Sequence, residues 1–353
     1  MNKVSRPLVT ISMMTYNQEK YVRDSVRGML AQTYEPLEIV ISDDCSMDRT
    51  WDIISEEVEA YKKNEGLHKN IILNRNEANL GILNNFEKMI SLCHGELLVM
   101  NSGDDISIAE RISRTVEVWI RNGRKAKLIH CGAWKINSEG YICGEVEELT
   151  ALNPRGACAA YAREVFTTFP LISRRDAYED RPNACRAIIL GTELYLSEKL
   201  VFYRIGGISL RLNSKERIKS FRHSLAGMAQ NLIDLKYALE HRLIPRLYYD
   251  ELVGRVMTVE NTFSRCLHWL AGNSVRERWH NRPFGAGKVF SCLKDIFKGH
   301  LGAGIPLMEM LLILLPFRMG FPLLDMSNSI LNRVSRRRRS RMRVLNGEIC
   351  QER

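Results

Sequence analysis

Apolar and polar positions follow two different periodicities along the first hundred residues. Short apolar runs rich in Val, Ile and Leu are separated by longer stretches with apolar residues at helical spacing, which is typical of βαβ units. The predicted elements are strands at 8–14, 37–41, 70–73 and 97–100, and helices at 21–31, 48–63 and 82–93. Strands that alternate with helices favour an α/β fold with a largely parallel sheet.

Two residues are predicted to bound these helices. Asp48 precedes the second helix and is a plausible N-cap, because its carboxylate can accept hydrogen bonds from the free N–H groups of the first turn. Gly95 follows the third helix and is predicted to be its C-terminal cap.

Beyond residue 212 the pattern changes. Helix-compatible apolar spacing at 221–239 and 248–270 predicts a helical C-terminal region over 213–353, with a linker or an exposed turn at 273–287. The segment 305–324 is the most apolar of the chain, but Glu309, Arg318 and two prolines interrupt it too often for a bilayer-spanning helix of about 20 apolar residues. An interfacial or re-entrant helix and a buried helical subdomain both remain open.

An arginine-rich segment follows at 333–343 and contributes to the formal net charge of +10. Each basic residue near an anionic membrane surface contributes about 1 kcal/mol of attraction, so the segment predicts peripheral membrane binding. Nucleic acid is disfavoured as a partner, because the chain has no helix-turn-helix, zinc-finger or aromatic RNA-platform motif. A solvated tail is the remaining alternative.

Composition narrows the class of protein. The 353 residues, 45% apolar and 26% charged, are ordinary for a globular chain. The nine cysteines form no Cys-x-x-Cys pair and the eight histidines show no zinc spacing, which predicts a reduced, cytoplasmic setting without structural zinc. The N-terminus does not read as a secretory signal, because its short apolar run leads directly into polar residues.

Three polar clusters fall where predicted strands end: Thr15-Tyr16-Asn17, Asp43-Asp44, and Ser102 to Asp105. Ligands bind at the carboxyl edge of open α/β sheets. Adjacent carboxylates there can hold Mg²⁺ or Mn²⁺, although they also serve as turn and capping residues. No Gly-x-Gly-x-x-Gly or Walker lysine motif follows a strand, which disfavours dinucleotide and P-loop sites.

Beside these clusters, Asp44 is placed to accept hydrogen bonds from the N–H edge of a nucleotide base. Asn79 and Gly81 can approach a ribose or phosphate closely, because glycine lacks a Cβ atom. The alternative for each is an ordinary turn or loop.

These residues resemble the nucleotide-sugar glycosyltransferases of family 2. The matching segments are Val9 to Asn17, Ser25 to Thr33, Ile41 to Ser46, Asn76 to Asn85, Gly103-Asp104-Asp105, Gly156 to Phe166, Tyr178-Glu179-Asp180 and Leu200 to Arg204. The resemblance spans about Leu8 to Ser209. It implies a Rossmann-like fold with a mixed, mostly parallel sheet, a catalytic domain over 1–212 with a nucleotide-sugar half (1–105) and an acceptor half (106–212), and a helical extension.

The resemblance also implies roles for particular residues. Ser102 stands where many members have the first aspartate of an Asp-x-Asp motif, so Asp104 is the implied ligand of a divalent cation, Mn²⁺ or Mg²⁺. Asp180 is the implied catalytic base, with Glu179 orienting the acceptor or Asp180. The implied nucleotide-sugar site consists of Thr15, Tyr16, Asn17, Glu19, Asp44, Asn79, Gly81, Asp105 and Arg204.

The implied reaction is an inverting transfer of a sugar from a nucleoside diphosphate to a hydroxyl of a glycan acceptor. By analogy with the family, the acceptor is expected to be lipid-linked, for example to polyprenyl diphosphate, in bacterial surface polysaccharide (O-antigen or capsule) synthesis at the inner face of the cell membrane. A nucleotidyltransferase and a non-catalytic membrane-associated adaptor that has kept the fold remain alternatives.

Overall fold

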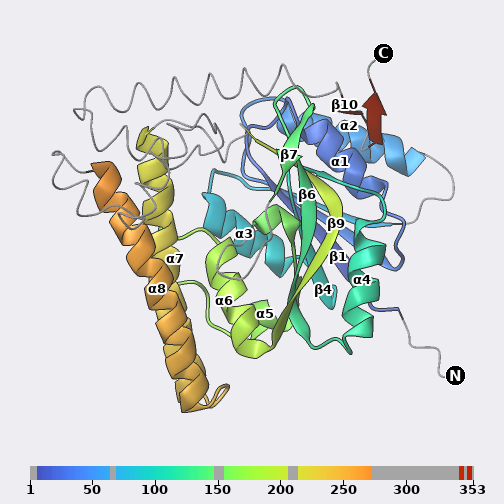
Figure 1. Cartoon of the computed structure of the whole chain (residues 1–353). Coiled ribbons are helices and arrows are strands. Elements are labelled where there is room, and N and C mark those ends of the chain that lie inside the picture. The colour runs from blue at the N-terminus through green and yellow to red at the C-terminus, as the bar shows by residue number, and fades with distance from the viewer. Residues whose placement is uncertain are drawn as a thin grey trace, which may run out of the picture.

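The first half of the chain forms four parallel strands joined by helices, as predicted (Figure 1). The computed structural model describes residues 6–63, 69–146, 155–205, 214–271, 342–345 and 348–351. The elements are, in order, β1 (Val9–Thr15), α1 (Val22–Leu30), β2 (Leu37–Asp43), α2 (Thr50–Lys63), β3 (Asn70–Arg75), α3 (Ile82–Ser91) and β4 (Leu97–Ser102). β1 lies between β2 and β4, and β3 pairs with the outer side of β2. The carboxyl ends of all four strands therefore meet at one edge of the sheet.

The second half extends the same sheet with strands of both directions, which confirms the mixed α/β fold. Its elements are β5 (Ile106–Ser107), α4 (Arg111–Arg121), β6 (Ala126–Ile136), β7 (Ile142–Glu145), η1 (Gly156–Cys158), β8 (Ala159–Ala162), α5 (Glu164–Thr167), α6 (Asp180–Leu190) and β9 (Thr192–Arg204). The strand order is β3-β2-β1-β4-β8-β6-β9-β5, with β7 paired to β6. Because β8 runs antiparallel to β4, the segment that enters β8 lies beside the carboxyl end of β4.

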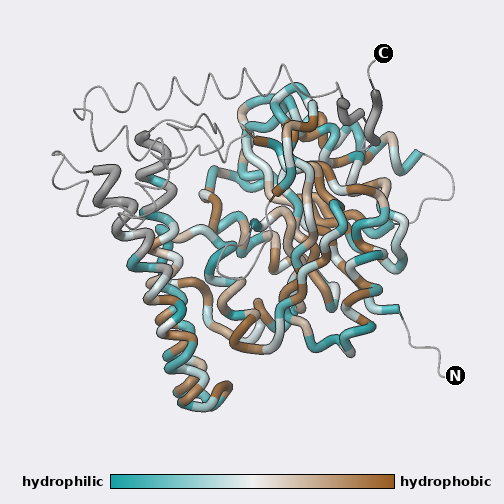
Figure 2. Tube along the Cα trace, in the orientation of Figure 1, coloured by the Kyte–Doolittle hydropathy of each residue, from teal (hydrophilic) through white to brown (hydrophobic). Residues whose placement is uncertain are grey.

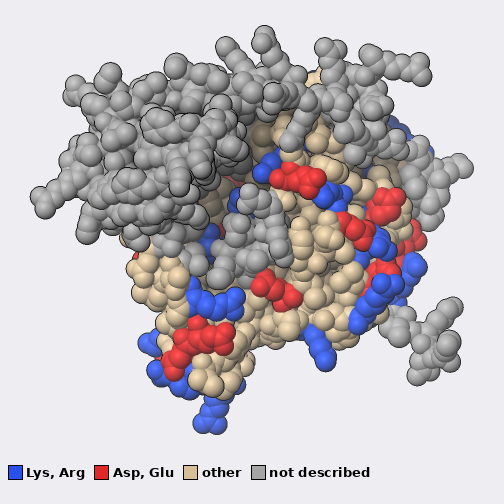
Figure 3. All heavy atoms as spheres, viewed as in Figure 1, with Lys and Arg blue, Asp and Glu red and all other residues tan. Residues whose placement is uncertain are grey.

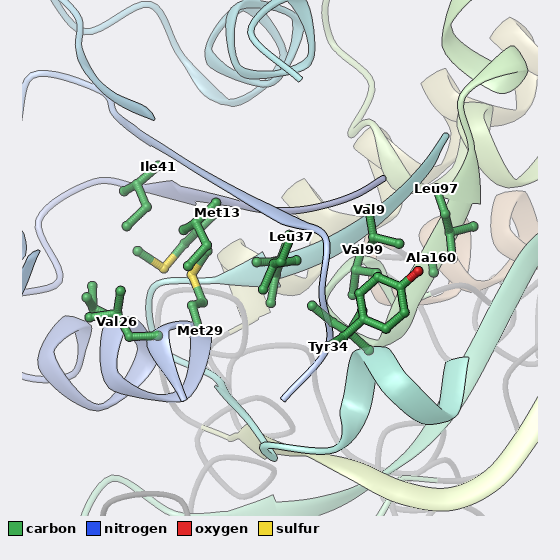
Figure 4. Packing of buried hydrophobic residues seen from close by; sticks show 14 of the residues in the cluster. Val9, Met13, Val26, Met29, Tyr34, Leu37, Ile41, Leu97, Val99 and Ala160 are labelled. Carbon is green, nitrogen blue, oxygen red and sulfur yellow. The ribbon is translucent and has the colours of Figure 1, made fainter. Parts of the chain in front are cut away.

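Apolar side chains cover both faces of this sheet. On one face, residues of β1, β2 and β4 pack against α1, including Met13 and Ile41 against Val26 and Met29 (Figure 4). The opposite face packs against α3 and α6 through residues such as Phe86 and Ala184. Brown, apolar segments accordingly concentrate in the strands at the centre of the molecule (Figure 2). The sheet is a buried layer between two helical layers, which gives its edge a rigid support.

The two helix-boundary predictions have different outcomes. Asp48 accepts a hydrogen bond from the backbone N–H of Thr50 at 2.9 Å, so it caps the start of α2. The prediction for Gly95 is wrong, because Leu92 ends α3 in a right-handed conformation. Gly95 instead lies against β1: its N–H donates to Thr10 Oγ1 at 2.9 Å, and a Cβ atom would come within 2.7 Å of that oxygen. Close backbone approach is the reason for this glycine.

The predicted C-terminal helices are α7 (Ser214–Glu240) and α8 (Arg246–Ala271), which form a long pair beside α6 (Figure 1). A buried polar network joins α7 to α6. Arg186 of α6 and Asp234 of α7 form an ion pair at 2.7 Å, with side chains 4% and 3% exposed. Gln230 donates to Asp234 at 3.0 Å and accepts a hydrogen bond from Ser173. The helix that begins with Asp180 is therefore tied to the C-terminal region.

Asp234→Asn is expected to lower the free energy of unfolding by about 3 kcal/mol, because it leaves the buried Arg186 guanidinium without a compensating charge. Urea unfolding measures this loss. The exposed pair Arg246–Asp250 provides the control, since Arg246→Met should cost less than about 1 kcal/mol. An equal cost for the two variants would show that the buried pair does not hold α7 in place.

Several predictions concern parts of the chain outside the described residues. These are the linker at 273–287, the apolar segment 305–324, and the arginine-rich segment except for its end, which enters the hairpin of β10 (Met342–Leu345) and β11 (Glu348–Gln351). Among the described helices, none has the length and apolar character needed to cross a bilayer. On the face shown in Figure 3, acidic and basic side chains of the described residues are intermixed.

Candidate active site

The turn after β1 is fastened to the loop after β2. Asn17 has a φ of 51°, a conformation that asparagine tolerates better than most residues. Its backbone N–H donates to Ser46 Oγ at 2.9 Å, and its Oδ1 accepts from the N–H of Met47 at 2.9 Å. Thr15 Oγ1 donates to Gln18 Oε1 at 2.7 Å within the same turn. The predicted Thr-Tyr-Asn turn is thus a rigid element at the sheet edge.

Glu19 and Tyr16 occupy the same turn. Glu19 Oε2 accepts a hydrogen bond from the N–H of Arg49 at 3.1 Å, and its own N–H donates to Asp48 Oδ2 at 3.1 Å. Glu19 therefore holds the start of α2 against β1. Tyr16 is half-buried and lies between these anchored residues. Contact of either side chain with a nucleotide sugar stays a prediction.

Asp44 organises the predicted Asn79 to Gly81 loop. Its carboxylate is buried and accepts hydrogen bonds from the backbone N–H of Leu80 at 2.8 Å and of Gly81 at 2.9 Å. Asn76 Nδ2 donates to the same carboxylate at 2.9 Å. Gly81 has a φ of 80°, which favours glycine. Since a carboxylate has about four lone-pair sites, Asp44 retains little capacity to accept from a base. Its main role in this structure is to shape the loop.

The guanidinium of Arg204 likewise donates its hydrogen bonds to groups of the protein itself. Its Nε donates to the carbonyl of Asp104 at 3.0 Å and its Nη1 to that of Asn137 at 2.9 Å. The guanidinium stacks 4.4 Å from the ring centre of Tyr21, and the Arg204 backbone N–H donates to Asp105 Oδ1 at 2.7 Å. This arrangement favours positioning of the 104–105 loop over the predicted direct contact with a diphosphate.

A buried arginine that sequence analysis did not single out lies beneath this loop. Arg111 is 1% exposed, and its Nη1 donates to Ser107 Oγ at 2.9 Å. Burial and the neighbouring Asp104 carboxylate raise the pKa of Asp105 well above its usual range, while the charges of Arg204 and Arg111 oppose that rise. An arginine at the start of an amphipathic helix gives no sequence signal of burial, so the pattern alone would not have revealed it.

Gly103 joins the loop after β4 to the turn after β1. A Cβ atom at Gly103 would meet the side chain of Gln18 and would lie 2.8 Å from Thr15 Oγ1. Only glycine fits without displacing one of these side chains. Asp104 is therefore held beside the β1 turn, as predicted for a site built from several strand ends.

Glu179 and Asp180, the two carboxyl residues predicted on the acceptor side, lie close to η1. Val99 of β4 pairs with Ala160 of β8, and this register places η1 next to the loop that carries Asp104. A Cβ atom at Gly156 would lie 3.7 Å from Glu179 Oε1 and 3.8 Å from Asp180 Cβ. Hence η1 links two distant segments: it contacts β4, the strand that leads to Asp104, and it lies close to the start of α6, which carries Asp180.

Electrostatics connect the two sides of the site. Burial raises the pKa of Asp180, and the charges of Arg181 and Arg155 oppose the rise. Burial and Asp105 raise the pKa of Tyr203, and Arg155 opposes this shift as well. A single guanidinium thus acts on both Asp180 and a residue adjoining the 104–105 loop, which supports a common site.

Glu179 is the second carboxyl of the predicted pair. Burial, and then the nearby Asp180 carboxylate, raise the pKa of Glu179 to about 8. The folded protein therefore keeps a proton on Glu179 at pH values where the unfolded chain has lost it.

Glu179→Gln is expected to raise the melting temperature at pH 8.5 and to leave it nearly unchanged at pH 5. The contribution of protonated Glu179 to stability is complete below about pH 4.3, the usual pKa of Glu, and is lost as the pH rises through about 8. Glutamine stays neutral and avoids this loss. Glu59→Gln, at an exposed position of α2, is the control and should shift the melting temperature equally at both pH values. An equal effect of Glu179→Gln at both pH values would refute the assignment.

No group of three His, Cys, Asp or Glu side chains that could hold a metal ion occurs among the described residues. Asp104 nevertheless offers the type of ligand that Mg²⁺ and Mn²⁺ prefer, a carboxylate oxygen at the end of a strand. The donor chemistry fits, and a bound diphosphate can supply further oxygens.

The sequence comparisons identify a domain. Residues 10–167 match the model of glycosyl transferase family 2. An uncharacterized protein of Mycobacterium bovis is 29% identical over 202 residues, which cover 56% of this chain and 54% of that one. An uncharacterized glycosyltransferase of Methanocaldococcus jannaschii is 28% identical over 145 residues, covering 40% and 47% of the two chains. The chain thus spans about half the length of these curated relatives. Glu179 and Asp180 lie beyond the matched 10–167 range.

The structural comparisons agree on the fold. TarS 1–349 of S. aureus, in complex with UDP-GlcNAc, is similar over 98% of this chain and 96% of that one, with a TM-score of 0.56 and 16% sequence identity. The mannosyltransferase PcManGT from Pyrobaculum calidifontis, in complex with GDP-Man and Mn²⁺, covers 88% and 86% of the two chains, with a TM-score of 0.55 and 16% identity. Residues 10–167 of this chain therefore carry a domain of the glycosyl transferase family 2 type.

Proposed function

We propose that this protein is an inverting glycosyltransferase that moves a sugar from a nucleoside diphosphate donor to a hydroxyl group of a glycan acceptor. The observation that carries the proposal is that η1 contacts β4, the strand that leads to Asp104, and that Gly156 of η1 also lies close to Glu179 and Asp180. The family match and the neighbours that bind UDP-GlcNAc and GDP-Man support a nucleotide sugar as the donor.

In the proposed reaction, the acceptor oxygen attacks the anomeric carbon as the bond to the leaving phosphate oxygen breaks. The electron pair of that bond departs with the nucleoside diphosphate, and Asp180 takes the proton of the acceptor hydroxyl. Burial raises the pKa of Asp180, which makes its carboxylate a stronger base than an exposed aspartate. A single displacement of this kind inverts the anomeric configuration.

Asp104 would hold a divalent cation, Mn²⁺ or Mg²⁺, against the diphosphate. When bound, such a cation neutralises the charge that develops on the leaving group. Asp105 and Arg204 serve this role indirectly, because Arg204 donates hydrogen bonds to Asp105 Oδ1 and to the carbonyl of Asp104, which fix the loop that carries Asp104.

A panel of UDP-GlcNAc, UDP-glucose and GDP-mannose, with and without Mn²⁺, tests the proposal by thermal shift and by release of nucleoside diphosphate. A donor at a hundred times its Kd should stabilise the fold by about 2.7 kcal/mol. Stabilisation with release supports the transferase. Stabilisation without release from any donor, under all acceptors tried, would favour a non-catalytic adaptor, and cleavage or formation of the diphosphate linkage itself would favour a nucleotidyltransferase.

We further propose that the acceptor is lipid-linked and that the arginine-rich segment 333–343 holds the enzyme at an anionic membrane surface, in bacterial surface polysaccharide synthesis. The dense positive charge of this segment supports membrane binding.

Replacing the arginines at 336–339 with glutamine is expected to abolish sedimentation with phosphatidylglycerol vesicles at low salt. Wild-type protein should sediment with these vesicles and be released at high salt, because screening weakens the attraction. Vesicles of neutral phosphatidylcholine are the control. Equal sedimentation of the variant and the wild type would contradict the electrostatic anchor.

A further inference from the structure

Three buried polar atoms without a hydrogen-bond partner occur near the proposed base: Tyr161 Oη, Glu179 Oε2 and Asn183 Nδ2. Tyr161 is 2% exposed and Asn183 is 1% exposed. A buried polar atom that makes no hydrogen bond costs about 1 to 3 kcal/mol, so native proteins rarely leave such atoms unmatched. Three of them at one place call for a common explanation.

The fold brings the three residues together at the start of α6. The N–H of Asn183 donates to the carbonyl of Glu179 at 3.2 Å, and this four-residue spacing places their side chains on one face of the helix. Tyr161 packs in the same apolar cluster as Ala184 of that helix. Burial, and then the charges of Asp180 and Glu179, raise the pKa of the Tyr161 phenol, which places its ring near both carboxyls.

The chemistry of the three atoms is complementary to a hydroxyl group. The Asn183 amide nitrogen can only donate, the Tyr161 phenol can donate, and the unpartnered Glu179 oxygen can accept, because a protonated carboxyl keeps acceptor lone pairs. An O–H group can accept two hydrogen bonds and donate one, so a single hydroxyl has the donor and acceptors that the three atoms require. A cation would face the Asn183 donor, and an anion could not donate the hydrogen bond that the unpartnered Glu179 oxygen accepts.

We propose that Tyr161, Glu179 and Asn183 form a hydroxyl-binding subsite beside Asp180. This inference rests on the proposed function, since it assigns the subsite to the acceptor side of the transferase. The oxygen belongs either to a second, non-reacting hydroxyl of the acceptor or to an ordered water that supports Glu179. In both cases Tyr161 and Asn183 are positioning residues, which set the direction from which the reacting hydroxyl approaches Asp180.

A high-resolution crystal structure of the full chain, free and soaked with 4-nitrophenyl β-glucoside, tests the subsite without requiring turnover. The proposal predicts an oxygen about 2.6–3.2 Å from at least two of the three atoms. A water oxygen there in the free crystal identifies an ordered water as the source, and a probe hydroxyl there in the soaked crystal identifies an acceptor hydroxyl. If neither crystal contains such an oxygen, the proposal is overturned.

Tyr161→Phe extends the test to function with a matched control. The variant keeps the ring packing and removes only Oη, so it should fold. Tyr61→Phe removes another buried, unpartnered hydroxyl, which lies on α2 away from the site. Tyr161→Phe is expected to raise the KM for the acceptor about tenfold with the donor KM unchanged, whereas Tyr61→Phe changes neither. Equal acceptor KM values in wild type and Tyr161→Phe would refute the subsite.

A failure of the subsite and a failure of the proposed function give different results in these experiments. If the wild type releases no nucleoside diphosphate from any nucleotide sugar, the transferase proposal fails, although the crystal can still contain the predicted oxygen. If the wild type is active and the oxygen is missing, only the subsite fails.

Discussion

Asp180→Asn is expected to lower the transfer rate about a hundred- to ten-thousandfold, the usual contribution of a general base, while the Kd for the nucleotide sugar stays within about twofold. Asparagine keeps the shape and can still accept the hydrogen bond from the N–H of Arg181, which is 2.7 Å long in the structure. Because the variant also removes a negative charge beside the buried Arg181, its melting temperature is measured alongside, so that a loss of chemistry is distinguished from a loss of fold. Rapid-quench measurement of nucleoside diphosphate release, combined with calorimetric donor binding, separates the two effects.

The pH dependence provides a second readout for Asp180. Because burial raises the pKa of Asp180, wild-type kcat/KM should rise with pH through a value above that of an ordinary aspartate. The variant should lose this limb of the profile. Asp176→Asn, at an exposed residue paired with Arg174, is the matched control and should leave rate and profile unchanged. A full wild-type rate in Asp180→Asn would remove Asp180 from the mechanism.

Asp104→Asn is expected to lower kcat/KM at least about a hundredfold and to raise the Mn²⁺ concentration needed for half-maximal activity. The charged oxygen that would hold the cation is replaced by a neutral amide, which is a weaker ligand for a hard cation. Activity titrated with Mn²⁺ at fixed donor concentration measures both changes.

Asp52→Asn is the control for Asp104, because Asp52 is an exposed aspartate on α2 and its loss makes the same change in net charge. It should leave the Mn²⁺ titration unchanged. If Asp104→Asn has the wild-type Mn²⁺ dependence, the cation is held elsewhere and the assignment of Asp104 is wrong.

Much of the nucleotide-sugar half could be predicted from the sequence because its signals are local. Apolar runs at 8–14 and 97–100 give β1 and β4, and the polar residues that follow must lie at the carboxyl edge of a parallel sheet. Asp104 and Asp44 were located in this way. The residues are brought to one edge, although Asp44 shapes the neighbouring loop and offers little to a base.

The features that could not be predicted depend on contacts between distant segments. The register of β8 against β4 decides that η1 lies beside Asp104, and no local pattern encodes that register. The same holds for Arg204, whose guanidinium is occupied by the carbonyls of Asp104 and Asn137. The sequence pattern predicts Gly95 at a helix end, but the need for this glycine arises 85 residues away, where Thr10 leaves no space for a Cβ atom.

The anomeric configuration of the product is the most direct test of the central claim that Asp104 and Asp180 act from two sides on one anomeric carbon. Proton NMR of the glycoside formed from an α-linked nucleotide sugar gives this configuration. The account predicts a β-linked product, because a single displacement inverts the centre. An α-linked product would require a second nucleophile on the enzyme and would contradict the account.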